Sequence, residues 1–290
     1  MLQTNGRHAF LVMSRSYSHQ LNFLLEQLDY SDNSIYLHVD KKAKSNGINL
    51  YYPKHASIHE IDREDVNWAA FSLVKVELSL LKEASKDGPY EYYHLLSESD
   101  LPIKSNAKIH EYFEDKDIEF VNIESINQKN DIRRIKYFFP LQEKAGKKHG
   151  TYWAMQKILM YIQMILHINR LKGNNFKLYA KGSEWFSITD DFVNYILSQE
   201  KVILKVFSYG QATDEMFIQT LLMNSSFKDK ISNVSQGNLR FIQWKKGNSP
   251  QVLIYPEDAK KMVSSECMFA RKFNFNTGNE LMRKIAELRK

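Results

Sequence analysis

Two adjacent carboxylates, Asp214 and Glu215, open a segment whose apolar residues have helical spacing. One of them is a candidate catalytic base, because a carboxylate within hydrogen-bond reach of an acceptor hydroxyl can remove its proton. A structural explanation stands beside this one. Thr213 can cap the helix, and acidic residues in a first turn interact favourably with the helix dipole. The residues by themselves leave both interpretations open.

A further acidic group, Asp100, follows a predicted strand at residues 92–96 and is soon followed by Pro102. Because proline lacks the amide that a sheet ladder needs, a central strand cannot continue far past it, and we expect the Asp100 carboxylate at a sheet edge. The acid-x-acid tripeptides at 98–100 and 115–117 resemble metal-binding motifs. Such short patterns often occur by chance, and no His or Cys cluster with zinc spacing accompanies them.

Three basic residues, Arg240, Arg271 and Lys272, are candidate ligands for a diphosphate. A guanidinium group can grip phosphate oxygens bidentately, and an ammonium group serves as a point charge. Aromatic residues flank both basic segments and would hold the cations near a cleft. Trp185 and Trp68 can stack on the face of a sugar, although packing in the core explains them equally well.

The order of the predicted elements indicates an α/β fold. Predicted strands lie at residues 8–14, 35–39, 57–61, 92–96 and 118–123, and predicted helices at 21–28, 69–84 and around Ile109. This alternation predicts a Rossmann-like, mainly parallel central sheet with flanking helices and with ligands at the carboxyl ends of its strands, where Asp40 and Asp100 fall. The first turn lacks the Gly-x-Gly-x-x-Gly pattern, which argues against a dinucleotide cofactor. The stretches 143–150 and 245–250 are predicted loops.

Length and composition favour one elaborated domain. The chain has 290 residues, of which 43% are hydrophobic and 26% charged, as in folded proteins. Cys267 is its single cysteine, so an intramolecular disulfide and a thiolate-rich metal site are excluded, and a reducing compartment fits best. The first eight residues lack the apolar core of a signal peptide, which predicts a cytoplasmic location. The formal charge of +6 suggests anionic ligands without singling out nucleic acid.

One apolar run, Ile158 to Ile168, is flanked on both sides by lysines and arginines. It is too short and too interrupted to span a bilayer. A buried core helix is the favoured interpretation. The alternative is a basic surface that docks peripherally on anionic membrane lipid, near a lipid-linked acceptor.

Seven ordered segments resemble the glycosyltransferase family that contains the core-2/I-branching β-1,6-N-acetylglucosaminyltransferases and the peptide O-xylosyltransferases, and most closely its compact bacterial members. The resemblance runs from about His8 to Phe273. The segments are His38-Val39-Asp40-Lys41-Lys42, Val66-Asn67-Trp68 with Phe71-Ser72-Leu73, Leu95 to Lys104, Gly182-Ser183-Glu184-Trp185-Phe186, Ala212-Thr213-Asp214-Glu215, Leu239 to Trp244, and Phe269-Ala270-Arg271-Lys272-Phe273.

The resemblance implies a GT-A-type fold, a UDP-sugar donor, inversion at the anomeric carbon and no essential metal or other cofactor. It implies a single catalytic domain over 1–290, with residues 1–123 as the nucleotide-sugar half and 124–290 as the acceptor-binding and catalytic half. Carried over by position, Glu215 is the general base. The donor sugar would be bound by Asp100, Ser99 and Trp185, and the nucleotide by Met13, Ser14, Asp40, Arg240 and Lys272.

The leading hypothesis is therefore a transferase that adds N-acetylglucosamine to a surface polysaccharide or a lipid-linked saccharide. Xylose is the nearest alternative donor sugar. A non-catalytic module that binds nucleotide or carbohydrate is a hypothesis of another class, and nucleic-acid binding rests only on the mild basic charge. The segment 124–177, which helps to bind the acceptor in this family, matches poorly, so the acceptor residues are not predicted.

Overall fold

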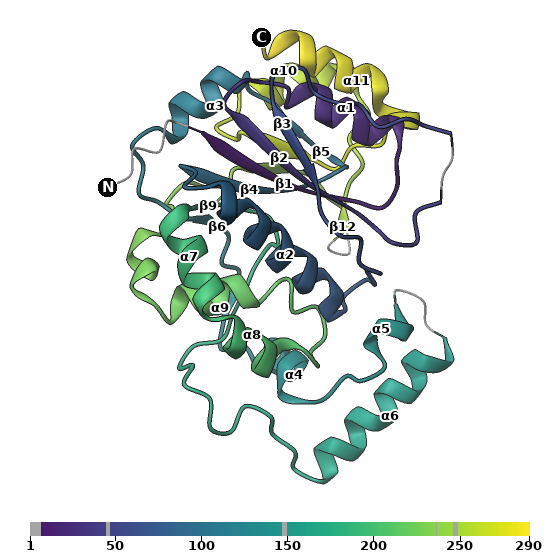
Figure 1. The fold of residues 1–290 in the computed structure, drawn as a ribbon. Helices are drawn as coiled ribbons and strands as arrows, with labels where there is room; N and C mark the ends of the chain where they lie inside the picture. Colours follow the sequence, from purple (N-terminus) through teal and green to yellow (C-terminus); the bar gives the residue numbers. More distant parts are fainter. Residues whose placement is uncertain (1–6, 45–46, 147–149, 236, 246–248) are drawn as a thin grey trace.

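The computed structural model of the chain describes residues 7–44, 47–146, 150–235, 237–245 and 249–290. Within these residues a six-stranded central sheet has the order β3-β2-β1-β4-β9-β6 (Figure 1). Its strands are β3 (Ser57–Glu60), β2 (Asn33–Val39), β1 (His8–Ser14), β4 (Tyr92–Ser97), β9 (Phe186–Thr189) and β6 (Phe120–Val121). The strands from β3 to β4 pair in parallel, whereas β9 is antiparallel to both β4 and β6. The predicted α/β class is confirmed, with a mixed sheet.

Helices cover both faces of this sheet. The described helices are α1 (His19–Gln27), α2 (Phe71–Asp87), α3 (Asn106–Phe113), α4 (Lys129–Lys136), α5 (Gln142–Ala145), α6 (Thr151–Ile165), α7 (Asp190–Ser198), α8 (Glu200–Phe207), α9 (Phe217–Met223), α10 (Ala259–Val263) and α11 (Phe275–Leu288). The helices α1, α3, α10 and α11 pack on one face, and α2, α7, α8 and α9 pack on the other (Figure 1).

Strand β1 shows why the sheet is buried on both sides. Its side chains alternate in direction, so Phe10 and Val12 join the core under α1 and α11, while Ala9 and Leu11 join the core under α2 and α7. A strand that is buried on both faces reads as a continuous apolar run, which explains the pattern at residues 8–14.

Smaller sheets extend the fold around the carboxyl ends of the central strands. A three-stranded sheet has the order β10-β13-β5 and comprises β10 (Arg240–Ile242), β13 (Phe269–Arg271) and β5 (Asp100–Pro102). Two antiparallel pairs join β7 (Ser125–Ile126) to β8 (Ala180–Lys181) and β11 (Trp244–Lys245) to β12 (Ser249–Pro250). Strand β5 ends at Pro102, so Asp100 lies on this peripheral sheet as the proline predicted.

The sequence-based boundaries differ from the structure in several places. The predicted strand 118–123 shortens to β6, and the predicted helix 69–84 begins later and ends later as α2. The predicted loop 143–150 begins inside α5, and its residues 147–149 lie outside the described residues. The predicted loop 245–250 joins β11 to β12, and its residues 246–248 also lie outside them.

The prediction of a buried core helix at residues 158–168 is wrong. The run belongs to α6, which lies on the surface at the end of the molecule opposite α11 (Figure 1). Ile158 is 59% exposed and Ile165 is 76% exposed. Across the described residues, no helix combines the length and the apolar character that crossing a bilayer requires.

Candidate active site

The two carboxylates precede their helix instead of forming its first turn. Helix α9 begins at Phe217, and the amides of Met216 and Phe217 both donate to the carbonyl of Thr213 at 3.0 Å. The Oγ1 atom of Thr213 is buried without a hydrogen-bond partner. The side chain of Thr213 therefore does not cap the helix, and this part of the structural explanation is wrong.

Glu215 is the exposed member of the pair. Its side chain is 38% exposed, and Oε2 accepts a hydrogen bond from Nη1 of Arg134 at 2.6 Å. The ammonium group of Lys181 lies 3.9 Å from the same oxygen. Two cations from α4 and β8 thus hold one carboxylate that solvent or a substrate hydroxyl can still reach.

The backbone at Glu215 is held by a close approach of Gly182, whose amide donates to the Glu215 carbonyl at 2.9 Å. A Cβ atom at Gly182 would lie 1.8 Å from the carbonyl oxygen of Asn122, so this position has no room for a side chain. The glycine therefore lets β8 pass between Asn122 and the turn that carries Glu215.

Asp214 points the other way, into a group of carboxyl side chains with Glu184 and Glu77. Burial, followed by the charge of the half-buried Glu184, raises the pKa of Asp214 well above its usual value. Burial likewise raises the pKa of Glu184, although the charge of Arg271 opposes this shift. Burial also raises the pKa of Glu77, whose side chain is fully buried. Burial therefore favours the neutral forms of Asp214 and Glu77, and Glu215 is the exposed carboxyl group of the adjacent pair.

Asp100 and Arg271 face each other across the β5–β13 ladder. Asp100 is fully buried, and its Oδ2 accepts hydrogen bonds from the amide and the hydroxyl of Ser97, both at 2.6 Å. Nη1 of Arg271 lies 3.4 Å from the Asp100 carboxylate, while its guanidinium carbon lies 3.8 Å from the centre of the Trp185 ring. Trp185 is only 6% exposed, so the structure places it beneath Arg271, where this guanidinium covers the ring.

The predicted nucleotide residues meet at the carboxyl edge of the parallel strands. Met13 accepts a backbone bond from Glu98 at 3.1 Å, and Ser14 accepts one from Asp40 at 2.9 Å. The Ser14 hydroxyl donates to Oε2 of Glu98. Oδ1 of Asp40 accepts from the Lys42 amide at 2.8 Å. The structure therefore brings Met13, Ser14 and Asp40 together, as the strand order requires.

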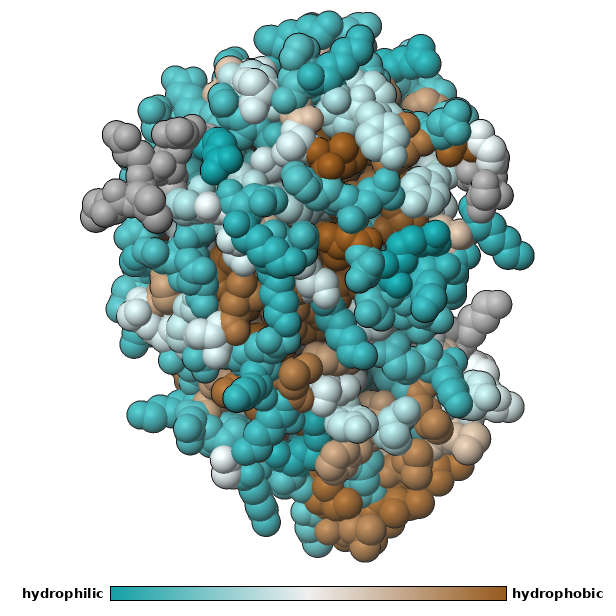
Figure 2. All heavy atoms as spheres, viewed as in Figure 1, coloured by the Kyte–Doolittle hydropathy of each residue, from teal (hydrophilic) through white to brown (hydrophobic). Residues whose placement is uncertain are grey.

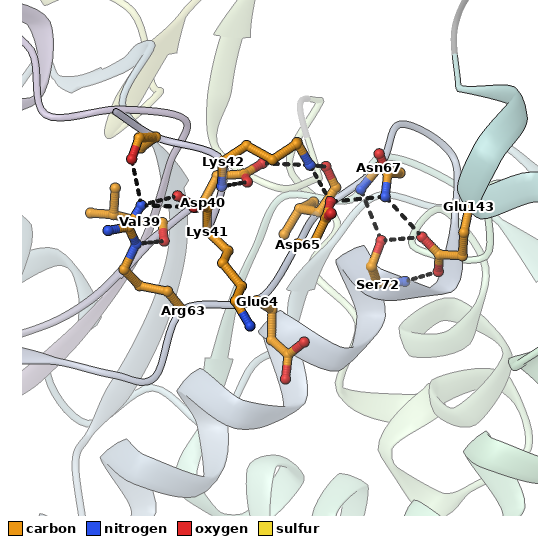
Figure 3. A network of polar contacts seen from close by, with 12 residues as sticks. Val39, Asp40, Lys41, Lys42, Arg63, Glu64, Asp65, Asn67, Ser72 and Glu143 are labelled. Atoms are coloured by element: carbon orange, nitrogen blue, oxygen red, sulfur yellow. Dashed lines mark hydrogen bonds and ion pairs between the residues drawn. The ribbon is translucent and has the colours of Figure 1, made fainter. Parts of the chain in front are cut away.

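The loop after β2 is fixed by a cation beneath it. The guanidinium group of Arg63 donates to the carbonyls of Val39, Asp40, Lys41 and Ala43 (Figure 3). These bonds fix the backbone of the loop, so the positions from which its charged side chains extend are also fixed.

The same network continues from this loop to helix α2 (Figure 3). Lys42 donates to Asp65, which accepts from Asn67 Nδ2 at 3.0 Å. Asn67 also donates to Glu143 at 3.3 Å, and Glu143 accepts from the Ser72 amide at 3.0 Å. Glu143 is thus an N-terminal cap for α2 supplied by α5, where an anion interacts favourably with the helix dipole.

Arg240 does not lie where a diphosphate could reach it. The residue is 1% exposed, and its guanidinium group donates to the Leu95 carbonyl at 3.1 Å, the Phe186 carbonyl at 2.6 Å and the Ser187 hydroxyl at 2.8 Å. These bonds join β10 to β4 and β9, so Arg240 is part of the core. The expected contact between Arg240 and diphosphate is therefore corrected to a structural role.

Lys272 follows Arg271 directly, and its backbone neighbour Phe273 donates to the Ser99 carbonyl at 2.9 Å. The Lys272 carbonyl accepts from the Leu253 amide at 2.8 Å. Lys272 and Ser99 therefore lie on adjoining segments beside Asp100, as the sequence motifs imply for a shared donor site.

The comparisons with known proteins agree with this arrangement. The family described as Core-2/I-Branching enzyme matches residues 8–265. The chain belongs to the Core-2/I-branching enzyme family. The resemblance inferred from the motifs is confirmed, and the mixed α/β architecture is consistent with a GT-A-like fold.

Two curated members of the family are similar to most of this chain. An N-acetyllactosaminide beta-1,6-N-acetylglucosaminyl-transferase from Homo sapiens is 24% identical over 231 residues, which cover 74% of this chain and 54% of the relative. Xylosyltransferase 2 from Rattus norvegicus is 23% identical over an alignment that covers 91% of this chain and 31% of the relative. The matched region thus spans about half of the first relative and about a third of the second.

Several site residues of this family member escaped the sequence reasoning. Arg134 lies in the poorly matching segment 124–177, and nothing in the local pattern of α4 links it to Glu215. In the sequence, Glu184 stands out only as part of its motif, and Glu143 only as part of a predicted loop. The contacts of these residues join positions far apart in the chain, and a periodic pattern in the sequence does not indicate such pairs.

Proposed function

We propose that this protein is an inverting glycosyltransferase that moves N-acetylglucosamine from a UDP-sugar to a hydroxyl group of a glycan or lipid-linked saccharide. The observation that carries the proposal is the half-exposed Glu215 carboxylate, held by Arg134 next to the buried Asp214. Membership of the Core-2/I-branching family supports the reaction class, and the human relative's name supports the choice of sugar.

Glu215 is the general base of the proposal. A base must reach the acceptor hydroxyl, and Glu215 is the exposed member of the adjacent pair. Asp214 is buried behind it, and this burial raises the pKa of Asp214 and so disfavours a second negative charge that would repel the departing diphosphate.

The transfer is a single displacement. The acceptor oxygen attacks the anomeric carbon of the donor while Glu215 takes the hydroxyl proton. The bond between that carbon and the phosphate oxygen breaks, and UDP leaves with the bonding electrons. Positive charge grows on the sugar ring and negative charge on the diphosphate, so groups placed against those charges stabilise the transition state more than the ground state.

The remaining residues bind the donor. Asp40, with the strand end at Met13 and Ser14, would hold the uridine. Ser99 would contact the sugar. The fully buried Asp100 would act through Ser97 and Arg271, and Trp185 through the Arg271 that stacks on it. Lys272 would neutralise the diphosphate without a metal.

A second donor, UDP-xylose, is favoured by one observation, because the relative from Rattus norvegicus is named a xylosyltransferase. The two donors require the same base and the same diphosphate contacts. They differ only in the contacts to the sugar, chiefly around Asp100, so the choice between them is a matter of measured donor preference.

The test is UDP release from a panel of UDP-sugars without acceptor, run in parallel with chelator and with manganese. Release from UDP-N-acetylglucosamine that survives chelator, and that Glu215→Gln abolishes, supports the proposal. Preference for UDP-xylose selects the second donor. Release only with manganese would show that a metal near Glu98 and Asp100 neutralises the diphosphate. Tight UDP binding with no turnover, even when glycan acceptors are supplied, rejects an enzyme and favours a binding module.

A further inference from the structure

Helix α6 reverses the usual pattern of a surface helix, because its buried residues are polar and its exposed side is apolar. The buried residues of α6 are two glutamines: Gln156 is 5% exposed and Gln163 is 8% exposed. Both bind the backbone of the preceding segment. Oε1 of Gln163 accepts from the Phe138 amide at 2.7 Å, and Oε1 of Gln156 accepts from the Leu141 amide at 2.8 Å. These polar contacts help to attach the helix to the fold, beside the half-buried Trp153, Leu159 and Met160.

The outer side of α6 is apolar. Met155, Ile158, Ile162 and Ile165 repeat at helical spacing and are 52%, 59%, 46% and 76% exposed. Tyr152 and Tyr161, nine positions apart, lie at the two opposite edges of this stripe, Leu166 follows the helix, and the three are 44%, 57% and 65% exposed. We call these seven residues the α6 surface. Figure 2 shows the corresponding hydrophobic patch as a broad brown area at the lower end of the molecule, and smaller brown areas lie higher on the same face. A contiguous exposed patch of large apolar side chains marks a docking site.

The charge around the α6 surface has one sign. From residue 144 to residue 183 the sequence contains no Asp or Glu, but it contains Lys144, Lys147, Lys148, Lys157, Arg170, Lys172, Lys177 and Lys181. Within the described part of the chain, Lys144, Lys157, Lys172 and Lys177 are exposed. Lys147 and Lys148 lie outside the described residues. An apolar stripe in a segment whose charged residues are all basic is typical of a helix that lies in the interface of an anionic bilayer.

We propose that the α6 surface docks this protein on an anionic lipid bilayer, with α6 parallel to the membrane plane. The isoleucines would enter the boundary between headgroups and acyl chains, the two tyrosines would lie at headgroup level, and the lysines would contact lipid phosphates. A second copy of the chain is a poorer occupant, because two surfaces without acidic residues would bring like charges together. The fifteen residues of α6 are too few to span a bilayer, so the contact is peripheral.

Docking at α6 would also determine which side of the molecule faces the membrane. The backbone of Phe138, which Gln163 binds, follows directly after α4, and α4 carries Arg134. A membrane bound at α6 would therefore lie on the side of the molecule from which α4 contacts Glu215. The docking itself does not depend on the proposed function, so binding can be tested without any activity.

The experiment is co-sedimentation with vesicles of phosphatidylcholine alone and with vesicles that also contain phosphatidylglycerol. We expect binding to the anionic vesicles only, and loss of that binding at high salt. The double variant Ile158→Asp/Ile162→Asp should lower partitioning by at least about tenfold, because both buried contacts with lipid are lost. Lys157→Gln should lower it by about fivefold. Both isoleucines are exposed, so circular dichroism should show an unchanged fold.

Matched controls lie at the opposite end of the molecule. Leu288→Asp in α11 and Lys261→Gln in α10 change an exposed leucine and an exposed lysine, and both should leave partitioning unchanged. Binding to neither vesicle overturns the proposal, and so does equal loss in the controls. Sedimentation velocity provides the last check: a dimer that Ile158→Asp/Ile162→Asp dissociates, without vesicle binding, would assign the surface to self-association.

Discussion

The carboxylate of Glu215 lies 2.6 Å from Nη1 of Arg134, although the two residues stand 81 positions apart in the chain. This ion pair joins α4 to the turn before α9. It fixes the direction of a carboxylate that remains 38% exposed, so the proposed base would be oriented before a substrate arrives.

Replacing Glu215 by Gln tests the base directly. The amide keeps the shape of the side chain but cannot take a proton, so transfer should fall by about 10²–10⁴-fold while UDP affinity stays unchanged. Single-turnover kinetics and calorimetric titration of UDP measure the two quantities. Near-normal turnover would remove Glu215 from the role.

Arg134 is expected to be a positioning residue. Arg134→Gln should lower kcat by about tenfold without changing UDP affinity, and Arg134→Lys should recover part of the loss because it retains the charge. Arg133→Gln is the matched control, since Arg133 lies on the same helix and its guanidinium group contacts the sulfur atoms of Met160 and Met164. Equal effects of the Arg133 and Arg134 variants would argue that α4 matters only as a whole.

The corrected role of Arg240 makes a prediction that separates it from Lys272. Arg240→Met leaves buried carbonyls without their donors and should cost about 3 kcal/mol or more of unfolding free energy. Lys272→Gln should cost less stability than Arg240→Met and weaken UDP binding by about tenfold. Urea unfolding and UDP titration provide both readouts, and the reverse pattern would restore Arg240 to the diphosphate site.

Gly182 should not tolerate a side chain. In Gly182→Ala the new Cβ meets the Asn122 carbonyl at 1.8 Å, so the backbone must shift, at a cost of about 2 kcal/mol. The shift also moves the Glu215 backbone and should lower turnover. Gly150→Ala is the control, because nothing lies within 4 Å of its Cβ position. Equal stability of the two variants would contradict the packing described for β8.

Glu119 should make stability depend on pH. Burial raises its pKa to about 7 despite the hydrogen bonds from the amide and hydroxyl of Thr189. The folded state therefore holds a proton that the unfolded state releases near the usual pKa of about 4.5. The resulting contribution to the free energy of unfolding is about 3 kcal/mol in total. It is fully present below about pH 4.5 and is lost as pH rises through 7.

The substitution Glu119→Gln should remove this part of the pH dependence, because the amide does not titrate. Urea unfolding between about pH 4.5 and 8 measures the slope. Glu111→Gln, at an exposed position of α3, should keep the wild-type slope. A Glu119→Gln protein whose slope equals that of the wild type would show that Glu119 is not the group that titrates.

The sequence alone determined the α/β class, the strands β1 to β4 and the position of Asp100 on a peripheral strand, because apolar runs and proline act locally. It also determined the family, through motifs that keep their order. Those motifs brought Glu215, Asp40 and Lys272 to attention as candidates, and their chemical roles stay predictions.

Only the tertiary structure decided which of those residues can be reached. Arg240 and Lys272 are both basic residues beside aromatic ones, yet the fold buries the first among carbonyls from β4 and β9. For the same reason, the sequence does not indicate that Arg134 is the partner of Glu215. Helix α6 shows the limit most clearly: its apolar run reads as core, but Gln156 and Gln163 take the inner side. Burial is a property of the packed whole, and the local pattern of a helix does not state which side will be covered.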